Sequence, residues 1–487
     1  MKETEVYSKT AASMKWSSAT EIMAKLISPV VSMLLARLLT PEAFGVVATV
    51  TMITSFADIF TDAGFQKYLI QHDFKSREEL DNSTTVAFWT NLSISVFLWV
   101  LIAVFSDSLA RLVGNDGLGN VIRIAALSLP MTSFSSIQMA RFKREFDFKT
   151  LFYTRLVTLF VPFFVTVPIA FLTRNYWALI AGNLALNCAN AIILTLKSPW
   201  KPKFYYNFSY FKMMFSYSWW ILLESIAVWL TSYIGTFVVG IVLSEYYLGL
   251  YKTSMATVNQ ITALITTATS MPLFVALSRL KNDDEKMVLV FRKYIQAIAA
   301  FVIPLGIGMW LYRGFLTSVL LGSQWGEAEN FIGLWGLTSS FCLVFGTYCN
   351  GYFNAKGKTK LSFLAQILHL VVLIPVIIWS SKEGYETLYI SRSLIRFELI
   401  LVELLLMKLM LKFPVSKLFI DTLPIFAATL MMTLADVFIH NLFEGIVWNV
   451  VGVLICMAVY FISLFLFSKK TLRNCLVVFG LSKQNIE

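Results

Sequence analysis

The stretch LARLLTPEAFGVVATV, Leu35 to Val50, places a Thr-Pro-Glu turn between two long apolar runs. Thr40 belongs to the residue types that cap helices, and Pro41 suits the first turn of the helix that follows. The pattern therefore predicts a tight hairpin of two helices. What kind of hairpin it is depends on the length and composition of the runs on either side.

Those runs are typical of a membrane protein. Hydrophobic residues make up 57% of the 487 residues, charged residues only 14%, and the mean hydropathy is +0.70. Soluble domains have a charged fraction of about a quarter, so this chain has too little polar surface to cover a soluble globule. Alternation at strand period is absent, which favours an all-α polytopic membrane protein over a β-barrel.

The number of apolar runs sets the number of expected spans. A hydrocarbon core of about 30 Å needs about 20 apolar residues per helix, and we expect about fourteen such transmembrane helices. Leu35 to Val50 then forms the turn between the first two. The expected spans are roughly 15–39, 42–66, 83–105, 119–140, 151–173, 176–196, 213–241, 247–277, 288–312, 327–351, 361–380, 385–407, 419–439 and 447–467.

Basic residues predict the orientation of these spans. Most of the 40 Lys and Arg residues lie in the loops on the side that also holds both termini. The loops on the opposite side hold only Arg111, Arg174, Arg313 and Lys382. By the positive-inside rule, both termini are expected in the cytoplasm. The net charge of +11 is spread over many short loops, which argues against a nucleic-acid partner, and we expect no cleaved signal.

Motifs for chemistry are missing from the sequence. The five cysteines fall in predicted spans or in the C-terminal tail and have no metal-binding or redox spacing. No stretch follows the phosphate-binding pattern G-x-x-x-x-G-K-[ST], and no nucleophile motif is present. We therefore expect neither an enzyme nor an ATP-driven pump, and no cofactor or metal.

The sequence also contains a weak internal repeat. A shift of 204 residues places LLTPEAFGVVAT over VLSEYYLGLYKT and aligns Leu39 with Leu243, Gly45 with Gly249 and Thr49 with Thr253. Six spans separate the copies, so they share one orientation and form a parallel repeat. We expect two parallel six-helix lobes around a central cavity, at 1–197 and 213–411. A cytoplasmic linker at 198–212 joins them, and two extra helices with a cytoplasmic tail fill 412–487.

Ordered motifs carry a family resemblance over about residues 10 to 410. The first hairpin, LLTPEAFGVVATVTMITSFADIFTDAGFQKYLIQ, resembles that of Wzx-type lipid-linked oligosaccharide flippases, in particular the colanic-acid and teichuronic-acid exporter branch. The later motifs RFKREFDFKTL, NYWALIAGNL, KSPWKPKF, YYLGLYKTSMATV, MPLFVALSRLKND and LLGSQW occur in the order of that branch. The family belongs to the multidrug/oligosaccharidyl-lipid/polysaccharide exporter superfamily.

The resemblance implies a fold and a task. The fold is two six-helix bundles, as the repeat predicts. The task is translocation of an undecaprenyl-pyrophosphate-linked oligosaccharide repeat unit from the cytoplasmic to the outer leaflet of the bacterial plasma membrane. The implied partners are the lipid-linked oligosaccharide, membrane lipids, and the polymerase and chain-length proteins of surface polysaccharide synthesis. We expect the protein to act as a monomer.

Charged residues inside the spans are the candidate site, because each is costly in hydrocarbon. Glu21 and Lys25 lie four residues apart in the first span, and Asp58 and Asp62 do so in the second, so that either aspartate could pair with Lys25. Cations would hold the pyrophosphate, and acids would balance them or couple protons or sodium. The resemblance places cavity cations in the first and eighth spans. The candidate cations are Lys25, Arg37, Lys252 and Arg396, and the candidate acids are Glu21, Asp58, Asp62 and Glu224.

Each of these assignments has a plainer alternative. Charges near span ends, namely Arg37, Arg123, Lys252 and Arg392, could simply snorkel to the interface. His369, the one histidine at mid-span, fits helix packing better than a proton relay. For the whole molecule, the alternatives to a flippase are a cation-coupled multidrug exporter of the same superfamily and a non-transporting scaffold for envelope assembly.

Overall fold

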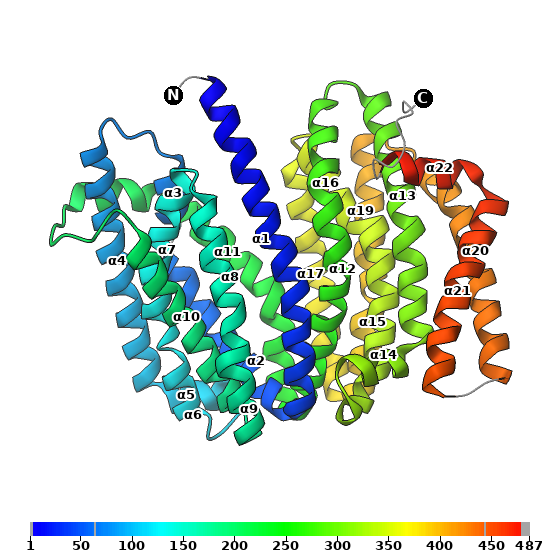
Figure 1. Cartoon of the computed structure of the whole chain (residues 1–487), viewed down its shortest axis with the longest axis horizontal. Coiled ribbons are helices and arrows are strands. Elements are labelled where there is room, and N and C mark those ends of the chain that lie inside the picture. Colours follow the sequence, from blue (N-terminus) through cyan, green and yellow to red (C-terminus); the bar gives the residue numbers. More distant parts are fainter. Residues whose placement is uncertain (1–2, 63–64, 443–444, 479–487) are drawn as a thin grey trace. The chain divides into compact units, whose positions relative to one another are not determined.

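The computed structural model describes residues 3–62, 65–442 and 445–478, and every regular element in them is a helix (Figure 1). Within these ranges the side chains of 3–15, 62, 216–221, 223–224, 227, 268, 442 and 476–478 are not described. The predicted all-α fold is confirmed. The chain forms two compact units, Met1–Lys252 and Thr253–Glu487, which are taken separately below.

In its described residues the first unit contains eleven α-helices, one π-helical segment and the start of α12. Leu38 ends α1 and Pro41 begins α2, as the opening stretch predicts, and the backbone N–H of Ala43 donates to the carbonyl of Thr40. The elements are α1 (Glu3–Leu38), α2 (Pro41–Asp62), α3 (Phe65–Gln71), α4 (Arg77–Val104), α5 (Ser106–Leu112), α6 (Gly119–Ala125), α7 (Ser128–Arg144), α8 (Phe148–Val161), η1 (Pro162–Thr166), α9 (Val167–Thr173), α10 (Trp177–Lys197), α11 (Phe208–Val242) and α12 (Glu245–Arg279).

Two glycines explain how α2 and α12 start against each other. A Cβ added to Gly45 would lie 1.9 Å from the carbonyl oxygen of Glu245, and one added to Gly249 would lie 1.8 Å from that of Pro41. Only glycine lets two backbones approach this closely. Gly45 and Gly249 are the pair aligned by the repeat, so equivalent positions of the two copies meet in the structure.

The second unit is built around one large apolar core on α13, the broken helix formed by α15, η3 and α16, and helices α19 to α22. A bidentate ion pair from Arg292 to Asp421, at 2.7 and 2.8 Å, joins α20 to α13. Its further elements are α13 (Asp284–Leu311), α14 (Arg313–Leu320), η2 (Ser323–Ala328), α15 (Glu329–Cys342), η3 (Leu343–Thr347), α16 (Tyr348–Ala355), α17 (Thr359–Lys382), α18 (Tyr385–Leu394), α19 (Arg396–Leu411), α20 (Val415–Leu442), α21 (Ile446–Phe467) and α22 (Lys469–Val478).

The division into units falls later in the chain than the linker at 198–212. Helix α11, which we assign by sequence to the C-terminal lobe, packs against α2, α3 and α4 of the first unit. The compact unit therefore continues to Lys252. The boundaries at 197, 213 and 411 remain a prediction about the repeat rather than about compactness.

Among the described residues, ten helices are long and apolar enough to cross a membrane, or eleven if the bent helix α12 is one span. Each of the fourteen expected spans coincides with a helix or a broken helix, but three of them do not qualify by length and composition over the residues that the structure describes. The run of α18 and α19 carries Arg392, Arg396, Glu398 and Glu403; α6 and α7 are separated by a break; and only Val228–Val242 of α11 qualifies, as a shorter apolar helix. Fourteen spans therefore remain a prediction.

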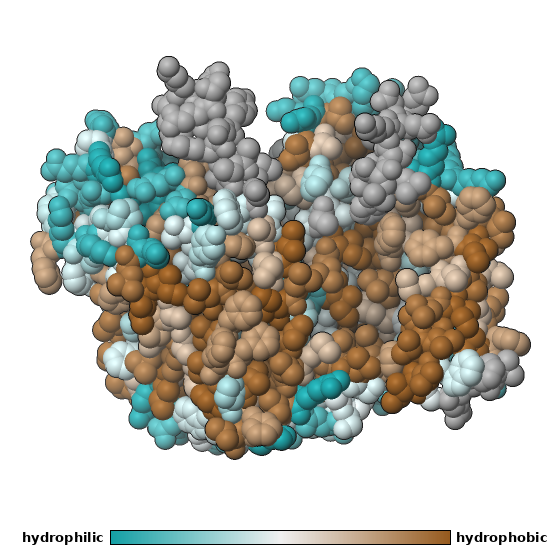
Figure 2. All heavy atoms as spheres, in the orientation of Figure 1, coloured by the Kyte–Doolittle hydropathy of each residue, from teal (hydrophilic) through white to brown (hydrophobic). Residues whose placement is uncertain are grey.

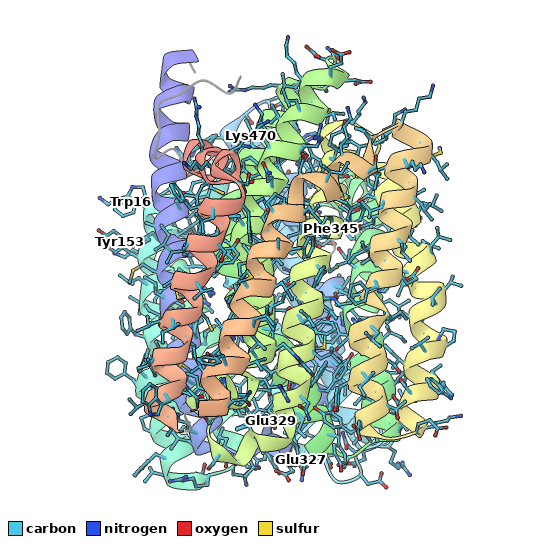
Figure 3. The ribbon with its side chains drawn as sticks, turned by 90° about the vertical axis from the view of Figure 1, so that its right-hand side faces the viewer. Trp16, Tyr153, Glu327, Glu329, Phe345 and Lys470 are labelled. Carbon is cyan, nitrogen blue, oxygen red and sulfur yellow. The ribbon has the colours of Figure 1, made fainter. Side chains whose placement is uncertain are left out.

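The surface of the units agrees with a membrane location. In Figure 2 a hydrophobic band covers the sides of the helices, and hydrophilic side chains gather at their ends. In the second unit, Lys470 lies at one end of the helices and Glu327 and Glu329 at the other, with Phe345 between them (Figure 3). In the first unit, Trp16 on α1 packs against Tyr153 on α8, with ring centroids 5.8 Å apart.

Candidate functional site

A cavity of about 370 Å³ in the first unit combines a cation, hydroxyls and aromatic rings. One face of α11 supplies Ser225, Trp229, Ser232 and Tyr233, which fall on one side of a helix because they are spaced by three or four residues. Exposed Lys67 on α3 lies across from them. Flat rings beside hydroxyls and an ammonium group suit a polar ligand that also carries negative charge.

The aromatic wall of this pocket is held in place by its neighbours. The indole N–H of Trp229 donates to Ser55 Oγ at 3.0 Å, which ties α11 to α2. Phe56 packs on the same indole at 4.7 Å, and Tyr233 stacks on it at 5.4 Å. On Tyr233, in turn, lies the ammonium group of Lys252, 4.9 Å from the ring centroid. Lys252, a predicted site cation, is thus brought next to the pocket.

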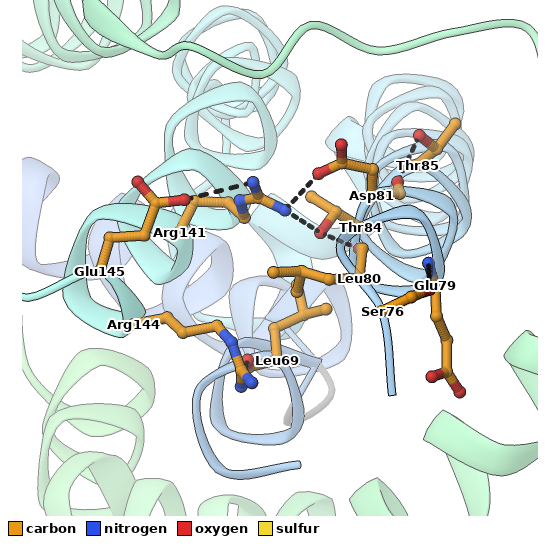
Figure 4. Close-up of polar contacts among 10 residues, drawn as sticks. All are labelled: Leu69, Ser76, Glu79, Leu80, Asp81, Thr84, Thr85, Arg141, Arg144 and Glu145. Carbon is orange, nitrogen blue, oxygen red and sulfur yellow. Dashed lines mark hydrogen bonds and ion pairs between the residues drawn. The ribbon is translucent and has the colours of Figure 1, made fainter. Parts of the chain in front are cut away.

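The position of α3, and so of Lys67, is fixed by Arg144 at the end of α7 (Figure 4). Its guanidinium donates to the carbonyls of Leu69, Ile70 and His72, at 2.8, 3.1 and 2.8 Å. These are carbonyls at the C-terminal end of α3, which have no partner within the helix. Burial lowers the pKa of Arg144 from its ordinary value, and the nearby Arg141 lowers it further.

Arg141, one turn before, joins α7 to α4 by a buried ion pair. Its side chain is 3% exposed and donates to Asp81 at 2.6 Å and to Glu145 at 3.3 Å (Figure 4). A third donation goes to the hydroxyl of Thr84. The two arginines together join α3, α4 and α7 at the end of the first unit where Lys67 lies.

The predicted charges on α1 and α2 are spread out. Lys25 is half-buried and Glu21 is exposed, and neither forms an ion pair with another described side chain. Asp58 accepts hydrogen bonds from Thr132 at 3.0 Å and from Thr61 at 3.2 Å. Arg37 is exposed in the last turn of α1. Asp62 and Glu224 lie outside the described side chains, so a pair between Lys25 and Asp62 remains a prediction.

In the second unit, Arg396 and Arg392 converge on one tryptophan. The guanidinium carbons lie 3.8 and 4.9 Å from the ring centroid of Trp335 on α15. Arg396 also donates to the hydroxyl of Ser339, one turn further along α15. Two half-buried guanidinium groups on one indole concentrate positive charge between α15, α18 and α19. An anion would be bound strongly there.

His369 has a partner that its sequence position does not reveal. Its Nδ1 lies 2.7 Å from Oε2 of Glu398, which joins α17 to α19 beside the two arginines. A single mid-span histidine thus belongs to a charged cluster of the second unit and not to apolar packing alone.

Sequence reasoning missed the pocket residues Lys67, Trp229 and Tyr233 and the role of Trp335. A signal for the α11 face was present, since Ser225, Trp229, Ser232 and Tyr233 form a polar and aromatic stripe at helical spacing. Lys67 gave no such signal, because it comes from another helix.

Comparisons with known proteins add the family. Residues 34–330, more than half of the chain, match the family described as "Polysaccharide biosynthesis protein". The succinoglycan biosynthesis transport protein ExoT of Rhizobium meliloti (strain 1021) is 23% identical, over 72% of this chain and 70% of its own. The lipopolysaccharide biosynthesis protein WzxC of Escherichia coli (strain K12) is 20% identical, over 76% and 75%.

A solved structure shares the fold. The lipid II flippase MurJ, in its inward closed conformation, superposes with a TM-score of 0.74 at 16% identity. The match covers 94% of this chain and 99% of MurJ. The family resemblance found in the sequence motifs is confirmed, and the helices form a transporter fold.

Proposed function

The chain belongs to the family of polysaccharide biosynthesis proteins, and from this premise we propose that it translocates an undecaprenyl-pyrophosphate-linked oligosaccharide repeat unit across the bacterial plasma membrane. The direction is from the cytoplasmic to the outer leaflet, by alternating access. Support comes from relatives whose names place them in succinoglycan and lipopolysaccharide biosynthesis, and from the fold shared with a lipid flippase.

The observation that carries the proposal is the pocket of Lys67, Trp229 and Tyr233. A lipid-linked oligosaccharide has a sugar head, a pyrophosphate of about two negative charges and a prenyl tail that stays in lipid. Sugar rings stack on aromatic faces and hydrogen-bond to hydroxyls, and the phosphates need cations. The pocket supplies these groups in one place, with Lys252 beside it.

The charges predicted from sequence keep their proposed roles. Lys25, Arg37, Lys252 and Arg396 hold the pyrophosphate in the course of transport, with Arg392 beside Arg396. Glu21, Asp58, Asp62 and Glu224 balance these cations or couple ion movement. We further propose cytoplasmic termini, a monomeric protein, and contact with the polymerase and chain-length proteins of the same pathway.

Purified protein in vesicles tests the proposal directly. A labelled lipid-linked oligosaccharide is added, and its leaflet distribution is followed with wild type, Trp229→Ala and Trp379→Ala. Trp379 is a matched control, because it is an exposed tryptophan on α17 that does not line the pocket. We expect wild-type flux in the control and about a tenfold loss in Trp229→Ala, as for a central aromatic contact.

The same assay separates the other candidate functions. Equal flux in all three proteins would overturn the pocket assignment. Failure of wild-type protein to move the lipid-linked sugar, while it moves cationic drugs, would identify an exporter of small molecules. No movement of either would indicate a scaffold.

A further inference from the structure

The carboxyl group of Glu403 on α19 is buried inside the second unit. The residue is 0% exposed. Its Oε1 accepts a hydrogen bond of 2.5 Å from Nδ2 of Asn350 on α16, whereas its Oε2 is buried without a hydrogen-bond partner. A carboxyl group buried to this degree with one oxygen unsatisfied calls for an explanation, because such groups are costly in hydrocarbon.

The surrounding backbone makes room for this carboxyl group. The π-helical turn η3 interrupts the helix between α15 and α16 and brings Gly346 against it. A Cβ at Gly346 would lie 2.7 Å from Oε2 of Glu403, so glycine leaves the space that the carboxyl group fills. Asn350 is itself oriented, since Ser362 on α17 donates to its Oδ1 at 2.6 Å. Turns of this kind often mark functional positions.

No counter-ion accompanies Glu403 among the described residues. The titratable groups that interact with it are the buried thiols of Cys342 on α15 and Cys349 on α16. The remaining charges near this part of α19 are engaged elsewhere: Arg396 and Arg392 with Trp335, and His369 with Glu398.

We propose that Glu403 is a proton-binding site of the second unit. In the loaded state Oε2 carries the proton. On release the O–H bond breaks, the proton passes to a water molecule that reaches Oε2, and the Asn350 amide, which donates to Oε1, stabilises the carboxylate left behind.

The ligand is a proton and not a metal ion because of the donor set. Hard cations require several oxygen ligands. Here the one oxygen that is free to bind is Oε2, since Asn350 turns its N–H toward the carboxyl group and its oxygen toward Ser362. Use of this proton to drive export rests on the proposed function, but the site itself does not.

Infrared spectroscopy of the purified full-length protein tests the site without any transport assay. A protonated carboxylic acid has a carbonyl band that is distinct from carboxylate bands and shifts in D₂O. We expect this band at neutral pH in wild type and in Glu383→Gln, whose carboxylate is exposed, and its loss in Glu403→Gln. An unchanged band in Glu403→Gln would overturn the proposal.

A second variant tests the proposal in case Glu403→Gln folds poorly. Asn350→Ala removes the one donor to the carboxylate, so the band should persist to higher pH than in wild type. A titration identical to that of wild type would count against the proposal.

The flux of lipid-linked oligosaccharide is measured in a separate experiment. Its stimulation by a pH gradient should disappear in Glu403→Gln. A wild type that carries the band but transports nothing would contradict the proposed function and leave the proton site standing.

Discussion

Two aspartates of this chain show how differently one residue type acts according to the burial of its partner. Asp81 pairs with Arg141, whose side chain is 3% exposed, at 2.6 Å. Asp283 pairs at 2.9 Å with Lys286, which is 71% exposed. A buried guanidinium depends on its carboxylate, whereas an exposed lysine exchanges its partner for water at little cost.

The substitution of each aspartate by asparagine should therefore have unequal effects. Asp81→Asn leaves Arg141 with Glu145, 3.3 Å away, as its remaining carboxylate, and we expect a loss of about 1–3 kcal/mol in the free energy of unfolding. Asp283→Asn should change it by less than about 1 kcal/mol. Thermal unfolding in detergent measures both changes. Equal shifts of the midpoint would show that the burial of Arg141 does not make its ion pair more stabilising than the exposed one.

For single residues, the sequence was a good guide to which charged residues lie inside spans, but a poor guide to which side chains contact one another. Spacing along one helix places Glu21 and Lys25 on a common face, but the pairing of Lys25 with Asp58 depends on how α1 rotates against α2, which no local pattern encodes. Asp58 accepts from Thr132 on α7 instead. The partner of His369 is likewise 29 residues away in the chain. Lys252 and Arg396 were predicted as site cations because a charge in a span is rare, whatever its partner.

Among the elements, the turn that begins α2 was the most accessible to sequence reasoning. The tight turn, Pro41 at the first position of α2, and the alignment of Gly45 with Gly249 were all readable, because turn residues act locally. What the repeat did not reveal is that the two glycines touch. A buried side-chain hydrogen bond 3.0 Å long, in which the Thr49 hydroxyl donates to the amide oxygen of Asn115, packs the loop before α6 against the same part of α2.

A methyl group at this crossing should be poorly tolerated. In Gly249→Ala the added carbon would lie 1.8 Å from the backbone oxygen of Pro41, so α2 and α12 must separate. We expect a loss of about 2 kcal/mol or more in stability, from strain at a packed contact. Gly308→Ala is the matched control, since a Cβ there meets nothing within 4 Å and alanine favours a helix by about 1 kcal/mol. Wild-type stability in Gly249→Ala would mean that the helices do not cross as described.

For the whole molecule, hydropathy was sufficient to predict an all-helical membrane protein but not to count its spans. The run of α18 and α19 does not qualify as a span because its helices are short and carry arginines and glutamates. Polar and charged residues inside a span therefore weaken the hydropathy pattern by which spans are recognised in a sequence. Charge in the loops is independent of that signal, and it makes the strongest statement about orientation.

Orientation can be tested on the second unit alone, where Lys470 lies at one end of the helices and Glu327 at the other. The positive-inside rule predicts that Lys470, next to Lys469 and near Arg473, faces the cytoplasm. The two variants are Lys470→Cys and Glu327→Cys in a Cys188→Ser background, because the other four native cysteines are buried. A thiol reagent that does not cross membranes, added to intact cells, should label the Glu327→Cys protein and leave Lys470→Cys unlabelled until the cells are opened. Labelling in the reverse order would contradict the cytoplasmic placement of Lys470 and would reverse the orientation predicted for the helices of the second unit.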